Sequence, residues 1–137
     1  MTSPGATFTW PNVPAGTVDN VAGGGVTVKL SGQGSKLAFL GAEAGFVSDT
    51  ATVHYTDGTT STGTLGFPNW CCTDPSAYGA QVAFYGLHRD TRSGPANYGI
   101  HYEAFYNAIP ITSTKTIPAV TLPNVIQIHI FDMTAQP

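Results

Sequence analysis

The sequence predicts an all-β fold, an antiparallel two-sheet β-sandwich of jelly-roll type. Apolar and polar residues alternate with a period of two along most of the chain, as half-buried strands do. Turn signals rich in Gly and Pro recur about every 8–12 residues, the spacing typical of sandwiches and barrels. Only 9% of the residues are charged, and the usual helix formers are scarce. A closed barrel is the alternative that the same pattern allows.

A single domain is expected over residues 1–137, because this length suits one domain and no linker or repeat divides it. In its first third, three short strands follow from local alternation. They are expected at residues 7–10, 25–30 and 36–40, with a turn at 31–34 between the last two.

The clearest local element is a hairpin. Residues 51–56 alternate cleanly and place Ala51, Val53 and Tyr55 on one face. The dipeptide Asp57-Gly58 follows and is a strong hairpin signal, so residues 59–67 are the expected partner strand.

Two long loops are expected next, at residues 68–79 and 89–98. Loops of this length often carry function. The strand between them, residues 81–88, is apolar on both faces, which predicts a central place in its sheet.

Three strands complete the chain, at residues 100–108, 116–122 and 125–133. Pro118 interrupts the second and predicts an edge strand, since proline has no N–H for the ladder. In the third, Ile126, Ile128 and Ile130 are expected on the core face.

Composition excludes several classes of function. Five basic residues and a net charge of −3 cannot form the basic stripe of a nucleic-acid binder. No apolar run approaches the roughly 18–20 residues of a membrane span. The N-terminus lacks the basic and apolar regions of a signal peptide. A starting Met without a signal peptide suggests a fragment of a larger protein, with a complete cytoplasmic protein as the alternative.

The sequence favours a non-enzymatic protein. The Gly-x-Ser-x-Gly pattern of a serine nucleophile is absent, and none of the eight acidic residues forms an evident pair. The four histidines lack the short spacing of zinc ligands. Asp19 and Asn20 in a loop, with Asp132 near the end of the last strand, offer oxygen ligands for a structural calcium ion. The alternative is that Asp19 only forms a turn.

Cys71 and Cys72 are adjacent. Adjacent Cα atoms lie about 3.8 Å apart, closer than in most disulfides, so a bond between them would form a local ring and not a long-range staple. Two free thiols are the alternative.

Aromatic residues in the long loops suggest a binding surface. An exposed ring offers a flat apolar face on which a sugar ring can stack, and neighbouring polar groups could bond its hydroxyls. The alternative for Trp70 is packing over one end of the sandwich. The candidate ligand-binding residues are Trp70, Tyr78, Arg89, Asp90, Arg92, Asn97 and Tyr98.

Three segments resemble a known family. They run from Tyr55-Thr-Asp-Gly to Phe67-Pro-Asn-Trp70, from Trp10-Pro-Asn-Val to Val18-Asp-Asn20, and from Lys115-Thr-Ile-Pro to Pro123-Asn124 with Ile128-His-Ile-Phe131. They look like accessory β-sandwich modules of secreted bacterial glycoside hydrolases, including family-92-type α-mannosidases. The resemblance covers nearly the whole chain, but Cys71-Cys72 stands where the family's loop carries aromatics.

The resemblance implies a noncatalytic, galactose-binding-like sandwich with a role in carbohydrate binding. We therefore expect a carbohydrate-binding or accessory module of a secreted glycoside hydrolase, which binds a neutral glycan through its loop aromatics. Its partners would be a polysaccharide or glycan and the catalytic domain of the parent enzyme. One alternative is a structural domain that packs on this catalytic domain without binding sugar. An independent small hydrolase is a further alternative.

Overall fold

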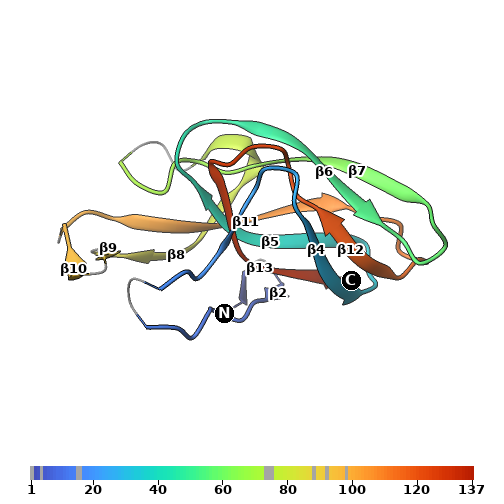
Figure 1. The fold of residues 1–137 in the computed structure, drawn as a ribbon, viewed down its shortest axis with the longest axis horizontal. Coiled ribbons are helices and arrows are strands. Elements are labelled where there is room, and N and C mark those ends of the chain that lie inside the picture. The colour runs from blue at the N-terminus through green and yellow to red at the C-terminus, as the bar shows by residue number, and fades with distance from the viewer. Residues whose placement is uncertain are drawn as a thin grey trace.

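In the computed structural model, the chain folds into two antiparallel sheets packed face to face (Figure 1). The structure describes residues 2–3, 5–14, 17–72, 76–87, 89–91, 93–97 and 99–137, without the side chains of residues 2, 3 and 90. The larger sheet has the order β3 (Val21–Ala22), β13 (Ile128–Gln136), β5 (Lys36–Glu43), β11 (Tyr102–Pro110), β8 (Gln81–Gly86). The smaller sheet has the order β4 (Thr27–Gly32), β12 (Ile117–Thr121), β6 (Ser48–His54), β7 (Thr60–Gly66).

Three small elements complete the described structure. Two are two-stranded ribbons, β1 (Thr2–Ser3) with β2 (Ala6–Thr7) and β9 (Arg89–Thr91) with β10 (Gly94–Ala96). The third is a single 3₁₀ turn, η1 (Ala77–Gly79). Among the described residues, no helix is long and apolar enough to cross a membrane.

The strand pairing is that of a jelly roll. The antiparallel pairs are nested along the chain, with β3 on β13, β4 on β12, β5 on β11 and β6 on β7. Such nesting is what a long double ribbon produces when it rolls up into two sheets. β8 extends the larger sheet beyond β11. The predicted antiparallel sandwich is confirmed.

The core lies between the sheets and follows from strand alternation. Leu37 and Phe39 of β5 face the same interior as Phe105 of β11, and all three are fully buried. From the smaller sheet, Ala51 and Val53 of β6 pack into the same cluster. Burying each of the Leu, Phe and Val side chains in this cluster stabilises the fold by about 1.5–3 kcal/mol.

The predicted hairpin is also confirmed. Tyr55, like Ala51 and Val53, is buried, and β6 pairs with β7. Gly58 has a φ of 84° and donates its N–H to the Tyr55 carbonyl oxygen at 3.0 Å. The left-handed conformation at this point favours glycine.

The N-terminal segment covers part of the outer face of the larger sheet. Ala6 and Phe8 are buried against Ala38, Leu40 and Tyr106 in a second apolar cluster. The strand expected at residues 7–10 is wrong in extent, because β2 ends at Thr7 and the segment then packs through side chains. Figure 1 shows this segment beneath β13.

Two predictions of strand position are wrong. β12 lies between β4 and β6, not at an edge. Its ladder to β4 is irregular between Ile117 and Ala119, which accommodates the missing N–H of Pro118. β8, expected to be central, is an edge strand with Val82 and Tyr85 exposed. Apolar residues on both faces of β8 therefore did not mean that the strand is buried in the middle of its sheet.

Three further differences arise from turns. The turn expected at residues 31–34 is shifted, because β4 runs to Gly32 and residues 33–35 connect it to β5, a strand of the other sheet. Residues 89–98, expected as a loop, contain the β9–β10 ribbon. Ile126, expected in the core, is 70% exposed because it lies in the turn that precedes β13, whereas Ile128 and Ile130 are buried as predicted.

Candidate functional site

A cleft of about 430 Å³ opens on the larger sheet beside the N-terminal segment. Small residues of neighbouring strands are among its lining: Ala42 on β5, Ala104 on β11 and Gly86 on β8. Their short side chains leave space between the larger groups around them. The other lining residues are Trp10, Asp19, Asn20, Glu43, Ala44, Trp70, Phe84, Arg89, Tyr102, Glu103, His129 and Phe131.

Aromatic rings form two groups on the walls of the cleft. Trp10 stacks on Phe131 with ring centroids 4.8 Å apart and also contacts Phe84 at 5.6 Å. Trp70 packs against Tyr102, with centroids 4.7 Å apart. These arrangements fall within the favourable range for aromatic pairs. The cleft therefore offers flat apolar surfaces held by ring-to-ring contacts.

The backbone of Trp70 is fixed between two strands of the larger sheet. Its N–H donates to the carbonyl oxygen of Glu43 at 2.9 Å, and its own carbonyl oxygen accepts the N–H of Glu103 at 2.7 Å. Cys71 forms an isolated antiparallel bridge with Tyr102. The part of the loop that carries Trp70 thus has the backbone order of a short strand.

Glu43 is a buried carboxyl group that lines the cleft. Only 1% of the residue is exposed, and the carboxylate accepts the backbone N–H groups of Val47 and Phe67. Burial raises the pKa of Glu43 above its ordinary value, although these two hydrogen bonds act in the opposite direction. Both oxygens have structural partners.

Asp19, Asn20 and His129 form a chain of hydrogen bonds at the cleft. Asn20 Nδ2 donates to Asp19 Oδ1 at 2.7 Å, and Asn20 Oδ1 lies 2.7 Å from Nδ1 of His129. The first two residues precede β3, and the third is on β13, which pairs with β3. The topology therefore brings together residues that are more than a hundred positions apart.

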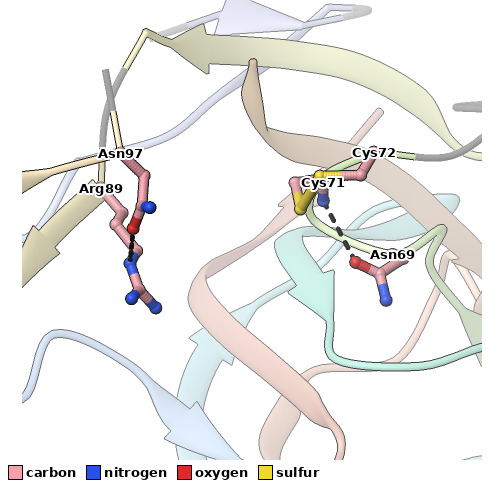
Figure 2. Close-up of a disulfide and its surroundings, with 5 residues drawn as sticks. All are labelled: Asn69, Cys71, Cys72, Arg89 and Asn97. Carbon is pink, nitrogen blue, oxygen red and sulfur yellow. Dashed lines mark hydrogen bonds between the residues drawn. A yellow bond between two sulfur atoms is a disulfide. The ribbon is translucent and has the colours of Figure 1, made fainter. Parts of the chain in front are cut away.

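Among the described residues, Arg89 is the one Lys or Arg whose side chain lines the cleft. Its Nε donates to Oδ1 of Asn97 at 2.6 Å (Figure 2). The ribbon β9–β10 brings these residues together, since Arg89 pairs with Ala96. Asn97 has a left-handed φ of 56°, a conformation that asparagine tolerates better than most residues.

Cys71 and Cys72 form a disulfide, with Cα atoms 3.7 Å apart (Figure 2). Of the two states left open by the sequence, the structure has the oxidised one. Oδ1 of Asn69 accepts the N–H of Cys71 at 3.1 Å, and Cys72 has a φ of 72°. The ring and this bond shape the loop directly after Trp70.

The structure gathers part of the predicted ligand-binding set. Trp70 and Arg89 line the cleft, and Asn97 supports Arg89. Tyr78 does not line it, because its ring packs near Gly66 and its carbonyl oxygen bonds Asn107. Three of the predicted ligand-binding side chains, those of Asp90, Arg92 and Tyr98, lie outside the part of the chain that the structure describes.

The predicted calcium ligands are not gathered together. Asp19 and Asn20 line the cleft, but Asp132 lines a separate hollow and accepts the N–H of Thr9 at 2.6 Å. Within the described part of the chain, no three His, Cys, Asp or Glu residues form a metal-binding group.

Several cleft residues were not predicted from the sequence. Trp10, Phe84, Tyr102, Glu103 and His129 come from different strands and segments, and only the fold brings them together. One signal was present for Trp10, because it directly precedes a proline and a loop rich in Pro and Gly. No local spacing marks the others.

The whole chain, residues 1–137, matches the family described as AziU2-like beta-sandwich domain. The chain belongs to this family. The match agrees with the two packed sheets of the structure. A search among curated proteins finds no match.

Proposed function

We propose that the domain is a noncatalytic carbohydrate-binding module and that the cleft holds a neutral glycan. The observation that carries this proposal is the pairing of aromatic walls with polar groups in one open cleft. The apolar face of a sugar ring can stack on Trp70 or Trp10, while its hydroxyls bond polar side chains.

The polar lining suits hydroxyl groups. Asp19 and Glu103 can accept hydrogen bonds from a sugar, and Arg89 can donate to one. Charged groups make the stronger bonds of this kind. The lining therefore supplies both orientation and specificity to a ligand that the rings attract.

We propose binding without cleavage because two of the three carboxyl groups in the cleft already accept hydrogen bonds from the protein itself. Glycoside hydrolysis commonly needs two carboxylates free to act on the scissile bond. The cleft contains Asp19, Glu43 and Glu103, but Glu43 accepts two backbone N–H groups and Asp19 accepts the amide of Asn20. An independent hydrolase remains the alternative hypothesis, and an assay with aryl glycosides tests it.

The wider setting rests on the sequence resemblance described above. We propose that the domain belongs to a secreted glycoside hydrolase of the family-92 type and binds glycan close to the catalytic domain. Attachment would raise the effective concentration of substrate there. A shallow, open site would bind weakly, since little remains after the cost of association.

A structural role is the second candidate, and one observation favours it. Val82, Phe84, Tyr85 and Leu87 are 41–56% exposed along and just after the edge strand β8. Exposed apolar surface marks protein interfaces, and Tyr85 and Leu87 lie outside the cleft, so these two residues would pack on the catalytic domain of a parent enzyme.

A glycan array tests the leading proposal. The wild-type domain should bind one or more neutral glycans, and Trp70→Ala should abolish that signal. Tyr78→Phe is the matched control, because Tyr78 lies outside the cleft. An array on which the folded wild-type domain binds no glycan would favour the structural role.

A further inference from the structure

The hydrogen-bond chain at the cleft fixes the orientation of one amide. A carboxylate only accepts hydrogen bonds, so the group of Asn20 that faces Asp19 Oδ1 must be the NH₂. The carbonyl oxygen of Asn20 consequently faces His129. The orientation of a side-chain amide is normally assigned from such a network, and here its contact with the carboxyl oxygen of Asp19 decides it.

The amide in turn fixes the proton of the imidazole. An amide oxygen only accepts, so Nδ1 of His129, which lies 2.7 Å from it, must carry the hydrogen. In a neutral ring the lone pair then resides on Nε2. His129 is thus held in one tautomer by two residues of the segment before β3.

The remaining nitrogen of His129 is open to a ligand. The ring lines the cleft, and the hydrogen bond to Asn20 is made through Nδ1. Nε2 has no hydrogen-bond partner among the described residues. Every buried side-chain nitrogen of those residues does have a partner. Nε2 is therefore not a buried atom, and a ligand can reach it. Its strand neighbours, Ala22 of β3 and Ala42 of β5, offer it no side-chain donor.

We infer that Nε2 of His129 is a hydrogen-bond acceptor of the cleft and that it binds a ligand hydroxyl. The inference rests on the proposed function for the nature of the ligand. With Asp19 and Glu103, Nε2 makes three hydrogen-bond acceptors in the lining of the cleft, whereas the guanidinium of Arg89 is a donor. A cleft so rich in acceptors selects a ligand that donates hydrogen bonds, such as a polyol, over a sulfated or carboxylated one.

The first test needs no ligand. In long-range ¹H–¹⁵N spectra of histidine-labelled protein at pH 8, where an ordinary imidazole is neutral, His129 should show the pure Nδ1–H form. Asn20→Ala should convert this signal to a mixture of tautomers, and His129→Asn should remove it, which assigns it. A wild-type ring with its proton on Nε2 would overturn the inference, whatever the domain binds.

The second test measures binding on an array of neutral and sulfated glycans. His129→Asn keeps an N–H donor for Asn20 and deletes Nε2, so it should weaken binding to the neutral glycans about tenfold. His54→Gln is the control, because His54 lies on β6 of the other sheet and bonds Thr121.

The outcomes separate the two proposals. Unchanged binding by His129→Asn, or a preference for sulfated glycans, overturns the role of Nε2 while glycan binding itself stands. Absence of any glycan binding by wild type overturns the proposed function, and the tautomer spectrum alone then decides the state of His129. Melting temperatures of both variants close to wild type establish that each is folded.

Discussion

Trp70 donates its backbone N–H to the carbonyl oxygen of Glu43, 2.9 Å away at the end of β5. The aromatic loop is therefore held by a strand in the middle of the larger sheet as well as by its own disulfide and the bond between Asn69 and Cys71. Glu43 also fixes the loops on both sides through its side chain, which bonds Val47 and Phe67. Glu43 thus connects β5 of the larger sheet to Trp70, which lines the cleft.

The side chain of Glu43 should be important for stability. Glu43→Ala leaves the backbone N–H groups of Val47 and Phe67 without an acceptor. Such a group costs about 1–3 kcal/mol when it is buried, and the Val47 contact, which is only part-buried, costs less than that of Phe67. We expect the free energy of unfolding, measured by urea denaturation, to fall by about 2–4 kcal/mol. Glu43→Gln should lose much less, because its amide oxygen still accepts one bond. Equal losses in both variants would contradict this account.

The same residue predicts a pH dependence. Burial raises the folded-state pKa of Glu43 above its unfolded value, so between these two values the folded state binds more protons than the unfolded state. Stability then falls as the pH rises through that window. The Glu43→Gln variant should lack this component, which a comparison of urea midpoints from pH 4 to pH 8 measures. Parallel curves for the two proteins would refute it.

The disulfide should contribute little to global stability. Cys71 and Cys72 are adjacent, and so small a ring is expected to contribute about 1 kcal/mol, against about 3 kcal/mol for a 15-residue loop. Reduction with a phosphine, verified by alkylation and mass, should lower the urea midpoint only slightly. A Cys71→Ala/Cys72→Ala variant should behave like the reduced protein. A loss of several kcal/mol would show that the ring supports more than its own loop.

The hairpin turn should be sensitive to acid. Asp57 accepts the N–H and the hydroxyl of Thr59 and pairs with Lys115 at 2.9 Å. These contacts, those of Thr59 foremost, lower the pKa of Asp57 to about 2 from an ordinary 3.8. Their stabilisation is fully present above the unfolded value and is lost as the pH falls through the folded one.

Asp57→Ala should therefore melt below wild type at neutral pH, and the difference should disappear as the pH falls below 2. Asp57→Asn should lie between the two proteins at pH 7, because its amide oxygen still accepts from Thr59 but carries no charge. Thermal scans followed by circular dichroism measure this. A difference that persists in acid would mean that the turn, and not the carboxylate, is disturbed.

Local patterns predicted the frame of the fold because the relevant forces act between near neighbours. The alternation of Ala51, Val53 and Tyr55 and the turn at Asp57-Gly58 needed no knowledge of the rest of the chain. The wrong predictions concern whether a strand lies in the middle or at the edge of its sheet, which depends on distant parts of the chain. Pro118 occupies a central strand because a ladder irregularity accommodates it, and no feature of its local sequence marks that irregularity.

The site was predicted less completely for a related reason. Trp70 and Arg89 were expected from their loops, but the opposite wall comes from residues that the jelly roll brings together across the chain. His129 meets Asn20 only because β13 pairs with β3. Pairing between strands as far apart in the sequence as β3 and β13 leaves no trace in local spacing.

The edge strand β8 offers a sharp comparison between the two candidate functions. Phe84 and Tyr85 are neighbours of similar size and exposure, but Phe84 lines the cleft and contacts Trp10, whereas Tyr85 stacks on His101 outside it. If the cleft binds glycan, Phe84→Ala should weaken binding about three- to tenfold, since an aromatic contact contributes about 0.5–1.5 kcal/mol beyond its area. Tyr85→Ala should leave glycan affinity unchanged.

If the domain instead packs on a catalytic domain through this edge, the pattern changes. Tyr85→Ala and Leu87→Ala should then weaken association with that partner, because both side chains are more than half exposed in the isolated domain. Calorimetry with a glycan and with the partner domain, on the same set of variants, distinguishes these cases. Loss of glycan affinity in Tyr85→Ala with none in Phe84→Ala would contradict the assignment of the cleft, because only Phe84 lines it.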